Sequence, residues 1–189
     1  MIRFHLDQGV DLIIATDNGS QDDSRLILER YNRAGRLILL DEPKHIHDQS
    51  VWVTRMAEIA NDREADWIIH SDADEFWWPE QDDLKKTLMQ SPASVDVWAV
   101  ERTNFLPPAE QSSRNFKPFY QRQKIRERNS TNSRGRPLPP KICHRAGPNI
   151  CITDNIFRNT NHARKILITL FTLLATATLV ALTYVYKFI

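Results

Sequence analysis

The sequence predicts an α/β fold: a mostly parallel sheet flanked by helices, followed by a C-terminal transmembrane helix. Apolar runs of strand-forming residues alternate with segments of helical periodicity, the order that builds crossover units. Two of these runs end abruptly in aspartate, and ligand sites of parallel sheets lie at the carboxyl ends of strands. A third observation, an uncharged run of 21 residues at 166–186, predicts the membrane helix.

The expected elements follow one another regularly, each strand being preceded by a helix. Hydrophobic periodicity predicts the helices at residues 1–8, 20–35, 51–61 and 82–90. Runs rich in Ile, Val, Leu and Trp predict the strands at residues 10–16, 36–40, 67–71 and 95–100. Gly9 and Gly35 end the first two helices, and Ser20 with Asp23 has the pattern of a helix start.

The 189 residues are enough for one domain with a substantial core, but the charge is unevenly distributed. Residues 1–100 carry 10 basic and 20 acidic side chains, and residues 101–189 carry 15 and 4. The net charge is only +1 and indicates no class of partner. We expect no nucleic-acid partner. We divide the chain into four segments. Residues 1–120 form a ligand-binding core, 121–140 a basic flexible loop, 141–162 the C-terminal part of the same domain, and 166–186 the membrane helix. The basic loop is compatible with a lid over a diphosphate and with a solvated linker.

Three carboxylates, Asp72, Asp74 and Glu75, follow the third apolar run. On an extended chain Asp72 and Asp74 point to one side and Glu75 to the other. Two carboxylates on one side repel each other unless a cation joins them, and carboxylate oxygens suit Mg²⁺ or Mn²⁺. The spacing therefore predicts a site for a metal ion and a diphosphate. The alternative is a solvated acidic turn after a strand.

Two segments together resemble a known family. Residues 12–23, a strand followed by Asp-Asn-Gly-Ser-Gln-Asp, are similar to the first motif of family 2 glycosyltransferases. Residues 67–76 resemble the D-x-D strand of the same family, and residues 3–11 resemble a helix-to-strand junction of a bacterial subgroup. The resemblance covers about residues 1–155. It implies a GT-A fold, a nucleotide-sugar donor, an acceptor that is a carbohydrate or lipid-linked, and a Mn²⁺ or Mg²⁺ ion.

The resemblance also implies roles for particular residues. Asp17 would hold the nucleoside, while Asp72 and Asp74 would bind the metal and, through it, the donor diphosphate. An inverting transfer also needs a carboxylate that deprotonates the acceptor hydroxyl, and Glu101 and Asp154 are candidates that match no motif. His144 or His162 is a candidate for completing the metal site. The run 76–79 could form a stacking wall for the acceptor or an aromatic plug in the core.

The uncharged run 166–186 has the length of a helix that crosses a bilayer, about 30 Å at 1.5 Å per residue. Arg164 and Lys165 precede it and Lys187 follows, so the positive-inside rule predicts a single-pass membrane protein with its catalytic part in the cytoplasm. A buried core helix is the alternative.

The resemblance also predicts that one strand is missing, because Met1 lies within the first helix of the pattern. We therefore expect an unpaired edge on the strand at 10–16, low stability, and low or no transferase activity of the chain. The competing interpretation of function is a membrane-tethered remnant or nucleotide-binding module without transferase activity.

Overall fold

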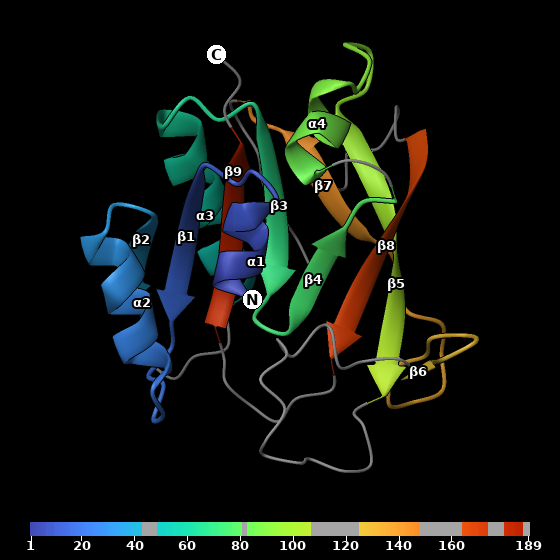
Figure 1. Cartoon of the computed structure of the whole chain (residues 1–189), viewed down its shortest axis with the longest axis horizontal. Helices are drawn as coiled ribbons and strands as arrows, with labels where there is room; N and C mark the ends of the chain where they lie inside the picture. Colours follow the sequence, from blue (N-terminus) through green and yellow to red (C-terminus); the bar gives the residue numbers. More distant parts are fainter. Residues whose placement is uncertain (43–48, 81–82, 107–124, 148–163, 174–179, 187–189) are drawn as a thin grey trace.

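A computed structural model describes residues 1–42, 49–80, 83–106, 125–147, 164–173 and 180–186 (Figure 1). Its helices are α1 (Ile2–Asp7), α2 (Ser24–Arg33), α3 (Gln49–Asp62) and α4 (Leu84–Met89). Its strands are β1 (Leu12–Asp17), β2 (Leu37–Asp41), β3 (Trp67–Asp72), β4 (Glu75–Trp78), β5 (Val97–Leu106), β6 (Ile125–Arg126), β7 (Lys141–Arg145), β8 (Arg164–Leu173) and β9 (Val180–Tyr186). The four helices and the first strands therefore lie close to where periodicity predicts them.

The strands form one mixed sheet in the order β2-β1-β9-β3-β7-β5-β8-β4, with β6 beside β5. In the part of the chain described, β1–β2 and β5–β8 are parallel, and the other pairs are antiparallel. The predicted mostly parallel, GT-A-like sheet is therefore wrong. Crossover helices do make β1 and β3 run in the same direction, but the later strands β7 and β9 insert antiparallel beside them.

The C-terminal segment forms strands where a membrane helix was predicted. Residues 164–173 and 180–186 are β8 and β9, and among the described residues no helix is long and apolar enough to cross a membrane. The predicted transmembrane helix, and the single-pass location derived from it, are therefore wrong. The run is rich in Thr, Ile, Val and Tyr, which fit a pleated sheet, and periodicity alone does not separate a buried strand from an apolar helix.

The strand β1 has no open edge. Its residues Leu12–Asp17 pair with β9 on one side, and most of them also pair with β2 on the other. The expected unpaired edge is therefore wrong, because a strand from the far end of the chain occupies that position.

Helices cover both faces of the sheet (Figure 1): α1, α2 and α4 lie on one face and α3 on the other. Alternation along each strand separates the two cores, since Ile13 and Ile69 face the first group and Ile14 and Ile68 face α3. Trp77 is fully buried in the first core, so the run 76–79 acts there as a core plug. Only Trp78 of that run is exposed to a large extent.

Candidate functional site

The strands β1 and β3 end in aspartate at the same edge of the sheet, as predicted for the first and third apolar runs (Figure 1). The strand β9 lies between them, and it pairs Val180 with Asp17 and Ala181 with Asp72. Two strand spacings of about 4.8 Å separate the backbones of β1 and β3 by roughly 10 Å. The two predicted motifs therefore end at the same edge of the sheet, two strands apart.

Asp17 is held by the turn and the helix that follow it. Its Oδ1 accepts hydrogen bonds from the Ser20 amide at 3.1 Å and the Ser20 hydroxyl at 2.5 Å, while Arg25 Nη1 lies 3.3 Å from Oδ2. Ser20 therefore closes the turn, and helix α2 begins four residues later than its sequence pattern suggests. Arg25 also pairs with Asp41 at the end of β2, and this hydrogen bond lowers the pKa of Asp41. Asp17 is 4% exposed, and Arg25 on α2 connects its carboxylate to Asp41 at the end of β2.

The predicted metal ligands lie where β3 turns into β4. Asp72 is the last residue of β3, Asp74 lies in the turn, and Glu75 begins β4. Because Asp74 lies in a turn and not on an extended strand, strand alternation does not place it on the same face as Asp72. Burial raises the pKa of Asp74, and the nearby negative charge of Asp72 raises it further.

Asp17 and Asp72 share no partner among the residues that the structure describes, although their strands end at one edge. Asp17 follows the face of Ile13 and Ala15 and contacts α2, whereas Asp72 contacts Gln49 at the start of α3, on the opposite face. The structure therefore groups Asp72 with Asp74, and leaves Asp17 in a separate network.

Glu75 is the central carboxylate of this turn, and sequence reasoning placed it away from the site. Its side chain is 0% exposed, and its Oε2 accepts a hydrogen bond from the Asp72 amide at 2.9 Å. Its Oε1 lies 3.9 Å from Arg102 Nη1 and accepts no hydrogen bond from the described residues. Burial is the main cause that raises the pKa of Glu75. No local pattern distinguishes it from its two acidic neighbours.

Lys141 at the start of β7 is the second residue that the sequence did not reveal. Its Nζ lies 2.9 Å from Asp72 Oδ2 and 3.1 Å from Glu75 Oε2, and its side chain is 5% exposed. Burial alone would lower the pKa of Lys141, but the charges of Glu75 and Asp72 outweigh it and raise the pKa. The ammonium group therefore stays charged and balances the buried carboxylate of Glu75.

The described residues offer a metal ion two carboxylates rather than a full protein cage. No group of three or more His, Cys, Asp or Glu side chains that could hold a metal occurs among them. Asp72 is 40% exposed, with one oxygen near Lys141 and the other accepting a hydrogen bond from Gln49 Nε2 at 3.0 Å. Because Mg²⁺ at nucleotide sites typically uses one or two carboxylates plus phosphate oxygens, Asp72 and Asp74 fit that kind of site.

The histidine candidates lie elsewhere or outside the described residues. His144 Nε2 is 3.0 Å from His70 Nε2, and its Nδ1 is 2.8 Å from the Arg145 carbonyl oxygen. Both rings are buried, and burial lowers the pKa of His144 to about 4, so the imidazole is neutral at pH 7. His144 is thus part of a histidine pair between β3 and β7. His162 lies outside the described residues.

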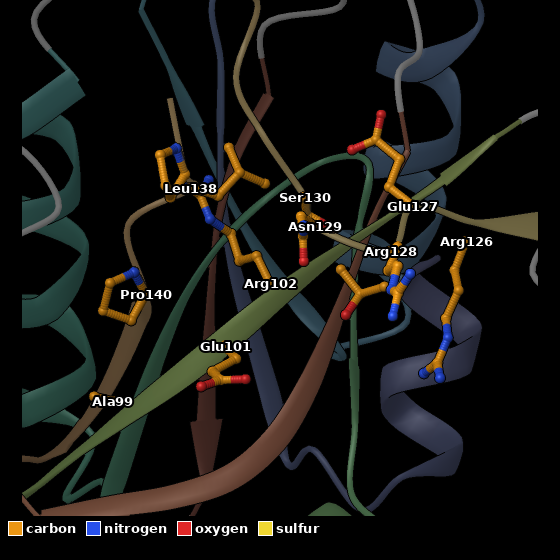
Figure 2. A pocket seen from close by; sticks show the side chains of 12 residues that line it. Ala99, Glu101, Arg102, Arg126, Glu127, Arg128, Asn129, Ser130, Leu138 and Pro140 are labelled. Carbon is orange, nitrogen blue, oxygen red and sulfur yellow. The ribbon is translucent and has the colours of Figure 1, made fainter. Parts of the chain in front are cut away.

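The two candidates for the catalytic base have different outcomes. Glu101 on β5 is exposed and lines a cavity of about 910 Å³ between β5 and the loop that leads from β6 to β7 (Figure 2). Arg102, its neighbour, lines the same cavity and approaches Glu75, so the cavity adjoins the acidic turn. Asp154 lies outside the described residues.

Comparison with known proteins found no family model, no curated protein and no solved structure that matches this chain. The resemblance to family 2 glycosyltransferases therefore rests on the two sequence motifs. The geometry adds that the strands of both motifs end at one edge of the sheet.

Proposed function

We propose that the chain binds a nucleotide-sugar through Asp72, Asp74 and a divalent metal ion, and transfers the sugar to an acceptor hydroxyl. The observation that carries the proposal is the position of Asp72 at the carboxyl end of β3 and of Asp74 in the turn that follows, at the edge where β1 also ends. β1 and β3 run in the same direction, although β9 lies antiparallel between them, and ligands of open α/β sheets bind at the carboxyl ends of such strands.

The surrounding residues have distinct tasks in this proposal. A bound Mn²⁺ or Mg²⁺ would stabilise the charge that develops on the departing nucleoside diphosphate. Lys141 neutralises Glu75 and fixes the turn, since it contacts both Glu75 and Asp72. Asp17 accepts two hydrogen bonds from Ser20 and so fixes the turn after β1. It would therefore support nucleoside binding partly by holding this turn in shape.

Within the described residues, Glu101 is the remaining candidate for the catalytic base. It is an exposed carboxylate in a cavity that adjoins the acidic turn, where an acceptor has room to enter. A carboxylate in this position can accept the proton of an acceptor hydroxyl.

A nucleotide-binding module without transferase activity is the second candidate. The observation in its favour is that both oxygens of Asp72 already have partners, Lys141 and Gln49. Such partners compete with a metal ion and would weaken the electrostatic stabilisation on which transfer depends.

Both candidate functions require metal-dependent nucleotide binding. Thermal melting with UDP, GDP and their sugar conjugates, with and without Mn²⁺, tests this binding. We expect a stabilisation that requires both nucleotide and Mn²⁺ and that Asp74→Asn abolishes. The exposed carboxylate Asp96, at the start of β5, provides the control variant Asp96→Asn, which should bind like the parent chain. Release of free nucleoside diphosphate from the stabilising conjugate then indicates transfer or hydrolysis, whereas binding without release indicates the module. Absence of any Mn²⁺-dependent shift would contradict both.

A further inference from the structure

The cavity beside β5 has the size of a small-molecule site. Its volume is about 910 Å³, within the range of roughly 300–1,000 Å³ that such sites occupy. Strand β5 forms one wall with residues 99–103, and the loop between β6 and β7 forms the other (Figure 2). The cavity therefore lies beside β5 and adjoins the acidic turn through Arg102, which lines it and also approaches Glu75.

Hydrogen bonds fix both ends of the loop wall. The side chain of buried Asn104 donates from Nδ2 to Glu127 Oε2 at 2.8 Å and to the Thr131 carbonyl oxygen at 3.0 Å. Its backbone amide donates to Ser130 Oγ at 2.8 Å. At the other end Arg102 Nε donates to the Pro139 carbonyl oxygen at 2.8 Å. The wall is therefore preorganised, which reduces the entropy lost when a ligand binds.

The cavity offers guanidinium groups that the protein does not neutralise. Arg126 and Arg128 line it, and no carboxylate among the described residues pairs with either. Glu127, which lies between them in sequence, is engaged by Asn104 and Thr131 instead. Because guanidinium groups match phosphate oxygens in geometry and charge, these two arginines are suited to a phosphate group.

The rest of the lining combines apolar residues, among them Leu138 and Pro140, with polar side chains that can bind hydroxyl groups. Glu101 contributes a carboxylate without a partner among the described residues, and Thr103 and Asn129 add further hydrogen-bonding groups. Figure 2 shows the two arginine side chains on one side of the cavity, away from Glu101. A ligand that satisfies both sides carries a phosphate at one end and hydroxyl groups at the other.

We propose that this cavity binds a phosphorylated sugar, with the phosphate on Arg126 and Arg128 and the sugar hydroxyls on Glu101. The proposed ligand shares Glu101 and this cavity with the acceptor of the proposed function. Its binding can nevertheless be tested separately, because it involves neither Asp72 and Asp74 nor a metal ion.

Isothermal titration calorimetry of the full chain without metal or nucleotide tests the proposal, with glucose 6-phosphate, inorganic phosphate and glucose as probes. We expect glucose 6-phosphate to bind most tightly, phosphate more weakly and glucose least. The double variant Arg126→Ala/Arg128→Ala should lose at least about tenfold in affinity for both phosphate probes, the change that a lost charge-assisted hydrogen bond produces. Glu101→Gln should weaken glucose 6-phosphate and leave inorganic phosphate unchanged.

Arg134→Ala/Arg136→Ala is the matched control, because these arginines lie in the same loop but do not line the cavity. It should bind all three probes like the parent chain, and circular dichroism melting of every variant should confirm that the fold is retained. Equal losses in the two double variants would overturn the proposal, since they would indicate general attraction to a basic loop. Absence of glucose 6-phosphate binding to the folded parent chain would overturn it as well.

Discussion

Replacing Lys141 with methionine removes the ammonium group that lies 2.9 Å from Asp72 and 3.1 Å from Glu75. Methionine has a similar shape, so the packing of β7 changes little. Asp72 is 40% exposed and water can hydrate it, but Glu75 is 0% exposed and loses its closest cation. Removing one partner from such a buried pair destabilises a protein by about 3–5 kcal/mol. For a chain of this size that lowers the melting temperature by about 6 to 20 °C.

Urea unfolding followed by tryptophan fluorescence measures the effect, since Trp67 and Trp77 are fully buried. Lys86→Met is the matched control, because that lysine is 60% exposed and pairs with Asp83 at 3.6 Å, and we expect it to change stability by no more than about 0.5 kcal/mol. Adding Glu75→Gln to Lys141→Met should recover part of the loss, because no buried charge then remains. If Lys141→Met is as stable as Lys86→Met, the ion pair does not stabilise the turn. If the double variant recovers nothing, the charge of Glu75 is not the cause.

Three further predictions concern the core, a helix cap and acid stability. Met56→Ala should destabilise the chain by about 2–5 kcal/mol in urea unfolding, because Met56 is fully buried between α3 and the sheet. Asp83→Ala should cost about 1 kcal/mol in the same assay, because Asp83 Oδ1 accepts the Lys86 amide at 2.8 Å as the N-cap of α4; an unchanged midpoint would contradict the cap. Burial lowers the pKa of His5 to about 3 from its usual 6.5. As the pH falls, the His5 ring therefore binds a proton in the unfolded chain before it does so in the folded chain. Stability should therefore decrease from pH 6.5 towards pH 3, and NMR should show no titration of the His5 ring between pH 7 and pH 5; a midpoint near 6.5 would show that the ring is solvated.

The sequence predicts the first half of the fold because the relevant patterns are local. The run that ends at Asp17 is short, apolar and followed by a turn, and β1 ends at that residue. The same holds for β3 and Asp72. Helical periodicity likewise locates α3 and α4 to within a few residues.

The second half depends on pairings between distant residues, which local patterns do not contain. The run 166–186 is apolar enough for a membrane helix, and only its pairing with β1, β3, β4 and β5 makes it two strands. The same limit applies to the site, because Lys141 reaches Asp72 only through the register of β7 on β3, 69 residues along the chain. The contact between Asp17 and Arg25 is closer in sequence, but it depends on how α2 packs against β1 and β2.

Anomalous diffraction from crystals grown with MnCl₂ and either UDP or GDP tests the proposed function most directly, because it locates the metal and the diphosphate together. We expect a manganese peak within coordination distance of Asp72 or Asp74, directly or through one water, with the diphosphate bound to the same ion. A nucleotide bound away from the end of β3, or a manganese ion that contacts neither aspartate, would contradict the proposed site.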